Sequence, residues 1–251
     1  MDCAVIIPCF REVQRLPRFL RELSAELARS AARIEILVVD DGSGEPEARE
    51  TCGIVREVQA EYSSITVESL ALPKNVGKGA AIYAGWRQVL PQNPALLAFV
   101  DADGSVPPHE VRRLVERLLG PEGTGWDALL GSRIKLLGSQ VDRVLLRHLV
   151  GRVFTTFTTL LTGVAAYDSQ CGLKVLRASA FAAIEAELEE QGFVFDVELI
   201  ATLQGRGYRL REVPIDWCDV AGSKVRLWRD SHRMFTGLLR IRHRLARRGG
   251  R

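Results

Sequence analysis

The sequence lacks several features that would define a compartment or a class of site. Its five cysteines are scattered and odd in number, and no two of them are spaced as Cys-x-x-Cys. This pattern argues against a disulfide framework and against a zinc site, and it favours a reducing cytoplasm. No basic stretch followed by an apolar core opens the chain, and no run of about 18 uncharged apolar residues occurs in it. We therefore expect neither a secretory signal nor a membrane span.

A strong net charge is also missing, but the charge is unevenly distributed. The 251 residues carry a formal net charge of +3, and 47% of them are hydrophobic, which is ordinary for a globular protein that buries its own core. Residues 225–251, in contrast, contain nine arginines and one acidic residue, Asp230. Such a basic tail predicts an acidic partner, which is a phosphate, an anionic lipid or a nucleic acid. Because no RNA- or DNA-binding signature accompanies it, we expect no nucleic acid partner.

Apolar runs and helical periodicities alternate through the first half of the chain. Buried strands are predicted at 3–8, 34–39, 65–70, 95–100 and 127–131. Helices are predicted at 16–29, 47–62, 80–90 and 108–119. This alternation indicates an α/β protein with a doubly wound, mostly parallel sheet flanked by helices. Pro214 makes 211–217 an edge strand, since proline cannot donate into a central ladder.

The second half of the chain contains two amphipathic segments. Residues 144–166 are apolar but interrupted by Arg147, His148 and Arg152, and the segment from Arg226 onward has apolar residues at helical spacing beside its arginines. Both predict helices that lie at a membrane interface, although 144–166 also fits a core helix with a charged outer face. We divide the chain into a domain at 1–224 and a basic amphipathic C-terminal helix at 225–251.

Pairs of carboxylates follow two of the predicted strands. Asp40 and Asp41 follow the second strand, and Asp101 and Asp103 follow the fourth, each pair ending in a glycine. Ligands of open α/β sheets bind at the carboxyl ends of the strands. Two hard oxygen ligands there suit Mg²⁺ or Mn²⁺ held together with substrate phosphates. The alternative for each pair alone is a polar Asp-Gly turn, but two such strand ends favour a nucleotide site plus a metal site.

A glycine-flanked lysine, Lys78, stands at the start of the predicted third helix. A helix N-terminus with a lysine is a plausible contact for a phosphate or a ribose. The spacing is not that of a P-loop, because Gly-x-x-x-x-Gly-Lys-Ser/Thr is absent. A glycine turn with a solvated lysine is the alternative, and this segment alone does not decide between the two.

Short motifs run in one order from about residue 3 to residue 225. They are Val5–Glu12, Val38–Ser43, Asn75–Gly79, Asp101–Asp103, Gly131–Arg133, Asp168–Gly172, Phe195–Leu199, Glu212–Trp217 and Gly222–Lys224. Together they resemble the family 2 glycosyltransferases with the GT-A (Rossmann-like) fold. Within that family they are similar to the dolichyl- and polyprenyl-phosphate sugar synthases, and the later motifs most resemble the dolichyl-phosphate β-glucosyltransferase branch.

The resemblance implies an inverting, metal-dependent transfer of a hexose from a nucleotide diphosphate sugar to a polyprenyl or dolichyl phosphate. UDP-glucose is the favoured donor and GDP-mannose the alternative. Asp101 and Asp103 would hold Mg²⁺ or Mn²⁺, and Arg133 and Arg147 would hold the acceptor phosphate, since arginine binds two phosphate oxygens at once. The residues implied in nucleotide-sugar binding are Pro8, Glu12, Asp40, Asp41, Lys78, Asp101, Ala102, Asp103 and Lys224.

Individual roles follow for some of these residues, and other functions stay open. The resemblance makes Asp40 the contact for the base or the ribose, and Lys224 a contact for the donor phosphates. A hydroxyl acceptor would instead need a base, for which Asp168 and Asp196 are the candidates. A sugar-phosphate nucleotidyltransferase and a non-catalytic nucleotide-sugar binder are further alternatives. We expect a cytoplasmic protein, peripheral on the membrane face, and leave open a homodimer or a membrane partner.

Overall fold

The computed structural model describes residues 1–135, 141–142, 145–218, 220 and 227–249. Seven strands form one sheet, and they are β1 (Cys3–Cys9), β2 (Ile34–Asp40), β3 (Thr66–Ala71), β4 (Leu96–Val100), β5 (Ala128–Ser132), β7 (Leu173–Arg177) and β8 (Leu210–Pro214). Two short strands, β6 (Val141–Asp142) and β9 (Trp217–Cys218), pair separately. The α-helices are α1 (Leu16–Leu27), α2 (Glu45–Glu61), α3 (Lys78–Val89), α4 (Pro108–Leu119), α5 (Leu145–Thr162), α6 (Ala178–Ile184), α7 (Phe195–Gly205) and α8 (Leu227–Gly249).

The strand order of the sheet is β3-β2-β1-β4-β7-β5-β8. β1 pairs in parallel with β2 and β4, β2 pairs in parallel with β3, and β5 pairs in parallel with β8. Only β7 runs against its neighbours β4 and β5. The predicted α/β class with a mostly parallel sheet is therefore confirmed, and β8 lies at the edge as Pro214 predicted. The carboxyl ends of β1, β2 and β4 meet at one edge of the sheet, where the acidic pairs follow.

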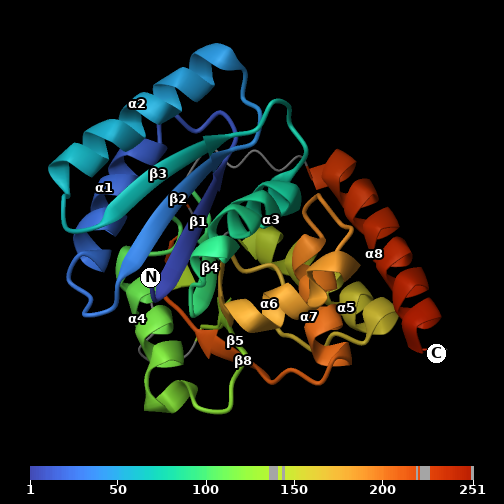
Figure 1. Ribbon diagram of the computed structural model, residues 1–251. Coiled ribbons are helices and arrows are strands. Elements are labelled where there is room, and N and C mark those ends of the chain that lie inside the picture. Colours follow the sequence, from blue (N-terminus) through green and yellow to red (C-terminus); the bar gives the residue numbers. More distant parts are fainter. Residues whose placement is uncertain (136–140, 143–144, 219, 221–226, 250–251) are drawn as a thin grey trace.

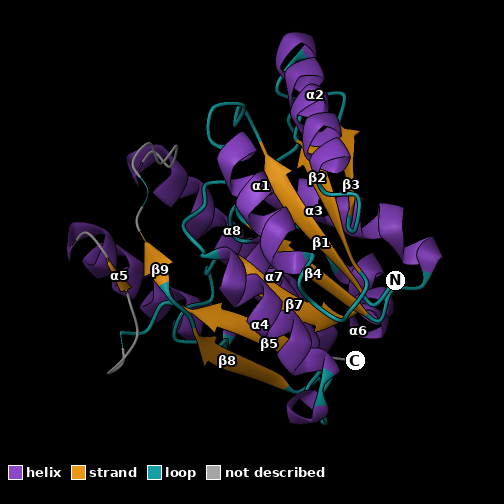
Figure 2. Ribbon diagram, turned by 90° about the vertical axis from the view of Figure 1, so that its left-hand side faces the viewer, coloured by secondary structure: helices purple, strands orange, loops and turns teal. Residues whose placement is uncertain are grey.

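Helices cover both faces of the sheet (Figures 1 and 2). α1, α2 and α4 pack on one face, where alternate β1 residues such as Val5 and Ile7 are fully buried. α3, α6, α7 and α8 pack on the other face, against Ala4 and Ile6. The central strands are buried on both faces, which explains why they appear in the sequence as continuous apolar runs without alternation.

The reversed strand β7 was not distinguished by its sequence from a parallel one. Its residues form only a short apolar run after the Gln170–Gly172 turn, and that run is compatible with either direction. The connection before it decides the direction, since the chain crosses over through α5 and enters the sheet between β4 and β5. The turn preceding β7 consequently lies beside the end of β4, where Asp101 donates its backbone N–H to the Gly172 carbonyl at 3.0 Å.

The two amphipathic segments form α5 and α8, which pack against each other. α8 also contributes to the core, because Leu238 and Ile241 are fully buried. On α5, Phe154 packs against the core while Phe157 is exposed, and the predicted place of this helix at a membrane interface stays a prediction. Among the described residues, no helix combines the length and the apolar character that crossing a membrane requires. The predicted domain boundary at residue 224 lies outside the described residues.

Candidate functional site

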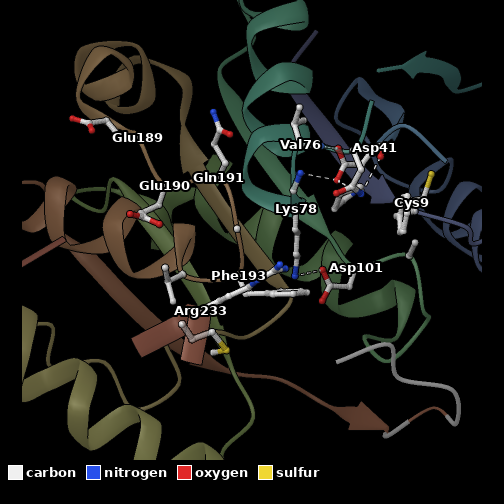
Figure 3. Close-up of a pocket in the computed structure, with 18 of the residues that line it drawn as sticks. Cys9, Asp41, Val76, Lys78, Asp101, Glu189, Glu190, Gln191, Phe193 and Arg233 are labelled. Carbon is white, nitrogen blue, oxygen red and sulfur yellow. Dashed lines mark hydrogen bonds and ion pairs between the residues drawn. The ribbon is translucent and has the colours of Figure 1, made fainter. Parts of the chain in front are cut away.

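A cavity of about 800 Å³ lies at the edge of the sheet where β1, β2 and β4 end (Figure 3). The segments that follow these strands form one side of it, and a loop before α7 together with α8 forms the other. The lining residues are Pro8–Phe10, Glu12, Arg15, Asp41, Asn75–Lys78, Asp101–Asp103, Glu189–Val194, Arg233, Met234, Thr236, Arg240 and Arg244. The cavity thus joins most of the residues predicted to bind a nucleotide sugar.

Asp41 organises the loop that leads into α3. Its carboxylate accepts the backbone N–H groups of Val76 and Gly77 at 2.8 and 2.9 Å and the side-chain amide of Asn75 at 3.0 Å. Burial raises the pKa of Asp41, and the two backbone N–H groups oppose that rise. Gly77 has a φ of 107°, and a Cβ there would lie 2.5 Å from the Gln191 carbonyl oxygen, so a side chain at this position would collide with the backbone of the opposite wall.

Of the first acidic pair, Asp41 lies on the cavity wall and Asp40 does not. Asp40 is buried behind the wall, where one of its carboxylate oxygens accepts the backbone N–H of Ser43 at 2.8 Å. The predicted contact of Asp40 with a base or a ribose stays a prediction. Pro8 and Glu12 line the cavity as predicted, and Glu12 accepts two hydrogen bonds from Arg15 at 2.7 and 2.8 Å.

Lys78 is the first residue of α3, and its ammonium group reaches the second acidic pair. Its Nζ lies 2.6 Å from Oδ1 of Asp101 and 5.5 Å from the ring centroid of Phe99 (Figure 3). Burial opposes the charged form of Lys78, but the charges of Asp101 and Asp196 outweigh it and raise the pKa of the ammonium group. The predicted contact of Lys78 with a nucleotide stays a prediction. The alternative, a glycine turn with a solvated lysine, does not describe Lys78, because its ammonium group is paired with Asp101.

Asp101 and Asp103 both line the cavity, and the charge of Asp101 acts on Asp103. Burial, followed by the charge of Asp101, raises the pKa of Asp103, although Asp103 accepts the backbone N–H of Ser105 at 3.0 Å. Two carboxylates on one partly buried cavity wall favour a nearby cation, and Lys78 supplies a single positive charge to one of them. A hard oxygen donor pair of this kind fits Mg²⁺ or Mn²⁺.

A buried ion pair lies beneath this acidic pair. Lys174 Nζ is 2.6 Å from Oδ1 of Asp196, and only 1% and 3% of these side chains are exposed. Lys174 also donates to the Cys171 carbonyl at 2.9 Å, which fixes the turn before β7. The next residue, Gly172, lies against Asp101, since a Cβ on Gly172 would stand 2.4 Å from Asp101 Oδ2. Burial raises the pKa of Asp196, and the charge of Lys174 opposes that rise.

Arg133 and Asp168, predicted for different roles, bind each other. The Arg133 guanidinium donates two hydrogen bonds of 2.7 Å to the Asp168 carboxylate, and it lies 4.7 Å from the ring centroid of Trp217. Burial opposes the charge of Arg133, but Asp168 outweighs it and raises the pKa of the guanidinium. Neither residue is among those that line the cavity. Arg133 was predicted to bind the acceptor phosphate and Asp168 to act as a base. In the structure, each of these side chains is already bound to the other.

Two further predicted residues are not tested by the geometry. Arg147 lies in the first turn of α5, and its side chain is outside the described part of the chain. Lys224 lies outside the described residues altogether. Their predicted contacts with the acceptor phosphate and the donor phosphates stay predictions.

The α8 wall of the cavity is held by arginine–glutamate pairs that the sequence did not predict. Arg240 and Arg244 both bind Glu190, at 2.9 and 2.6 Å. Arg244 also lies 3.0 Å from Glu198, which accepts the backbone N–H groups of Glu189 and Glu190. Burial opposes ionisation of Glu190, but hydrogen bonds and charge from the two arginines outweigh it and lower the pKa of this carboxyl group. These pairs fix α8 to the loop at 189–194.

A second cluster of acidic side chains lies away from the cavity and differs from the pair Asp101 and Asp103, because its central carboxylate is fully hydrogen-bonded. His109, Glu110 and Asp216 present ligand atoms within 4.8 Å of one another, and this is the one such group among the residues whose placement is described. Both carboxylate oxygens of Glu110 are already engaged, one by Arg113 and the other by the backbone N–H of Asp216. The cluster is therefore a hydrogen-bonded junction between α4 and the segment after β8.

The sequence profile described as glycosyl transferase family 2 matches residues 4–183. This range contains Asp41, Lys78, Asp101 and Asp103, which meet in the cavity. The chain belongs to this family.

Curated relatives in the family share about three residues in ten with the chain. A dolichyl-phosphate beta-glucosyltransferase of Trichomonas vaginalis is 31% identical over 88% of this chain and 65% of its own length. The Saccharomyces cerevisiae and Homo sapiens proteins of the same name are 27% and 28% identical, over 95% and 88% of this chain and 73% and 69% of their own lengths. The chain thus spans about two thirds to three quarters of the length of these relatives.

Solved structures of glycosyltransferases share the fold of the chain. Glucosyl-3-phosphoglycerate synthase from Mycobacterium tuberculosis, in complex with UDP, superposes with a TM-score of 0.64 at 16% identity, covering 96% of this chain and 78% of that one. A mannosyltransferase from Pyrobaculum calidifontis, in complex with GDP-mannose and Mn²⁺, gives a TM-score of 0.61 at 16% identity, covering 98% and 64%. At this identity the likeness concerns the fold, and it confirms the predicted GT-A class.

In this family 2 member, the strand-end acids are evident from the sequence, and the groups that support them are not. Lys174, Glu190, Arg240 and Arg244 are far from those acids in the sequence, and no short motif joins them. The only signal available was a charge inside an apolar run, as at Lys174 between Leu173 and Val175. A charge at such a position predicts a buried partner but does not identify it.

Proposed function

We propose that this family 2 glycosyltransferase transfers glucose from UDP-glucose to a dolichyl or other polyprenyl phosphate, with inversion at the anomeric carbon, on the cytoplasmic face of a membrane. The observation that carries the proposal is the pair Asp101 and Asp103, facing a cavity of about 800 Å³ between the strand ends and α8. The names of the curated relatives support the glucosyl donor and the lipid acceptor.

The donor occupies the side of the cavity formed by the strand ends. Pro8, Glu12 and Asp41 line this side, and they surround the nucleoside. Lys78, at the N-terminus of α3, is close to the diphosphate, where an ammonium group and the positive end of the helix dipole both favour negative charge. Asp101 and Asp103 would hold Mg²⁺ or Mn²⁺, and such an ion would supply positive charge for the departing nucleoside diphosphate.

A phosphate acceptor fits the state of the acidic residues better than a hydroxyl acceptor does. A phosphate monoester is already anionic near neutral pH, since its second pKa is about 6, and it needs no strong general base. A hydroxyl acceptor needs one. The two candidates, Asp168 and Asp196, are ion-paired with Arg133 and Lys174 at 2.7 and 2.6 Å. Both carboxylates are therefore already held by an internal partner, and neither lines the cavity in which a hydroxyl acceptor would have to bind.

The membrane part of the proposal rests on an apolar strip formed by α5 and α8. Its residues are Phe157 and Leu160 on α5 and Phe235 and Leu239 on α8, with exposed fractions of 45%, 73%, 42% and 43%. Phe157 and Phe235 pack edge to face, with ring centroids 5.9 Å apart, so the strip is continuous across the two helices. An exposed apolar surface beside an arginine-rich helix face suits the interface of an anionic bilayer.

The cytoplasmic side is supported by the cysteines. All five, which are Cys3, Cys9, Cys52, Cys171 and Cys218, are free thiols, and three of them are buried. Free thiols are typical of a reducing compartment.

An assay of product formation tests the function. The full chain is incubated with Mn²⁺ or Mg²⁺, radiolabelled UDP-glucose or GDP-mannose, and dolichyl phosphate in vesicles, and the organic extract is counted. We expect label from UDP-glucose in the lipid fraction and none with Asp103→Asn. Label from GDP-mannose alone would overturn the sugar assignment. Transfer only to a soluble hydroxyl compound would overturn the lipid acceptor.

A further inference from the structure

Five cationic side chains line the cavity, and four of them are ion-paired. Arg15 pairs with Glu12, Lys78 with Asp101, and both Arg240 and Arg244 with Glu190. The fifth is Arg233, in the second turn of α8. Among the side chains that the structure describes, none forms an ion pair or a hydrogen bond with the Arg233 guanidinium. A guanidinium that is exposed in a cavity is a ready donor for a phosphate, which it can bind through two oxygens.

Arg233 stands where the cavity meets the apolar strip. Met234 follows it in the cavity wall, and the next residue, Phe235, belongs to the strip. Phe193, which is exposed, lines the same wall from the loop before α7 (Figure 3). A ligand with a phosphate at one end and a hydrocarbon chain at the other could therefore place its phosphate at Arg233 and its chain along the apolar strip.

One of the two arginines that the sequence predicted for the acceptor phosphate is differently placed, and the side chain of the other, Arg147, is outside the described part of the chain. Arg133 directs its guanidinium fork to Asp168 and is not among the residues that line the cavity. Binding a phosphate with this fork would leave Asp168, which is buried, without its partner, and that carries a large cost. Arg233 requires no such exchange with any side chain that the structure describes.

We propose that Arg233 binds the phosphate of the prenyl phosphate acceptor and orients it toward the donor site. This inference rests on the proposed function, because it concerns the acceptor of that reaction. The ligand is a phosphate monoester of an isoprenoid alcohol. Glu190, bound by Arg240 and Arg244, holds α8 so that Arg233 faces the cavity.

Equilibrium binding and kinetics of the full chain test the assignment with Arg233→Gln, Arg233→Lys and the control Arg242→Gln. Arg242 is exposed on the same helix, does not line the cavity, and carries the same charge. In one arm, calorimetry measures binding of geranyl phosphate, a short soluble acceptor, to the protein with Mn²⁺ and UDP. In the other arm, initial rates are measured with dolichyl phosphate in neutral phosphatidylcholine vesicles.

We expect Arg233→Gln to raise the Kd for geranyl phosphate and the KM for dolichyl phosphate by roughly 10- to 100-fold, the range of a charge-assisted pair of hydrogen bonds. Arg233→Lys should lose less, and Arg242→Gln and the UDP-glucose KM should not change. A raised UDP-glucose KM would overturn the assignment, because Arg233 would then bind the donor. A loss confined to vesicles would also overturn it, since Arg233 would then act only as surface charge. Unchanged constants in both arms would do the same.

The outcome for the wild-type chain separates the two proposals. Binding of geranyl phosphate that depends on Arg233, without glucosyl transfer, would sustain the phosphate site and overturn the proposed function. Transfer that is indifferent to Arg233 would sustain the function and overturn the site. Neither binding nor transfer would overturn both.

Discussion

Nζ of Lys78 lies 2.6 Å from Oδ1 of Asp101, where α3 begins beside the end of β4. Lys78, at the start of α3, is thus the counterion of Asp101, which follows β4. A divalent metal bound between Asp101 and Asp103 would share Asp101 with this ammonium group, and two cations at one carboxylate repel each other. Lys78 therefore opposes the metal when the site holds no phosphate, and it favours a phosphate once one is present.

Replacing Lys78 with methionine should separate these two effects. We expect Lys78→Met to bind Mn²⁺ roughly three- to tenfold more tightly without nucleotide, because one positive charge is removed beside the metal site. Affinity for UDP in the presence of Mn²⁺ should fall about tenfold, because the diphosphate loses a cation. Electron paramagnetic resonance of free Mn²⁺ and calorimetry with UDP measure the two constants.

Lys135→Met is the matched control, since Lys135 is exposed and does not line the cavity. It should leave both constants unchanged. Weaker Mn²⁺ binding by Lys78→Met would contradict the opposition between lysine and metal.

Gly172 should be intolerant of even one methyl group. A Cβ there would stand 2.4 Å from Asp101 Oδ2, so Gly172→Ala must move the carboxylate. We expect Mn²⁺ affinity and transfer rate to fall about tenfold or more, since metal ligands tolerate little displacement. The free energy of unfolding should change by less than about 1 kcal/mol, because the displaced group is the end of a side chain at a cavity.

Gly205→Ala provides the comparison for this substitution. Gly205 ends α7, and a Cβ on it would meet nothing within 4 Å. This variant should retain its activity and be slightly more stable, by up to about 1 kcal/mol. Equal activity losses in both variants would show that the contact with Asp101 is not responsible.

Much of the fold, and the position of the acidic residues at the edge of the sheet, were predictable because their signals are local. A buried strand of a parallel sheet is a continuous apolar run, and acids that directly follow such runs lie at the ligand-binding edge of the sheet, as Asp101 and Asp103 do. Lys78 was identified by its place at a helix N-terminus. These predictions needed only spacing within a few residues.

The rest depended on contacts between distant segments. The pairing of Arg133 with Asp168 joins residues 35 positions apart, and that of Arg240 with Glu190 joins residues 50 apart. Each of these side chains has the right chemistry for a substrate, so its sequence alone does not distinguish a ligand contact from an internal partner. The direction of β7 was equally undetermined, because an apolar strand has no local mark of its orientation.

The anchoring of α8 should depend on pH through Glu190. Arg240 and Arg244 lower the pKa of Glu190 despite its burial, so the folded protein binds this proton less tightly than the unfolded chain does. The stabilisation is therefore present above the ordinary glutamate pKa of about 4.3 and is lost as pH falls through the lower folded value. Glu190→Gln should reduce the free energy of unfolding by about 2 kcal/mol near pH 7 and by progressively less below about pH 4.

Urea unfolding at about pH 7 and about pH 3.5 measures the difference between Glu190→Gln and the wild type. Glu45→Gln is the control, because Glu45 pairs with Arg49 on the exposed face of α2 and should contribute less than about 0.5 kcal/mol. If the difference in the free energy of unfolding between Glu190→Gln and the wild type were larger at acid pH, that result would contradict the pairing of Glu190 with Arg240 and Arg244.

Donor binding by calorimetry tests the central claim most directly. The wild-type chain and Asp103→Ala would each be titrated with UDP-glucose and GDP-mannose, with and without Mn²⁺. The account predicts that the wild type binds UDP-glucose in preference to GDP-mannose, that Mn²⁺ strengthens this binding, and that Asp103→Ala loses the metal effect while staying folded. Absence of binding to either sugar nucleotide by the folded wild type, or Mn²⁺-dependent binding that survives Asp103→Ala, would contradict it.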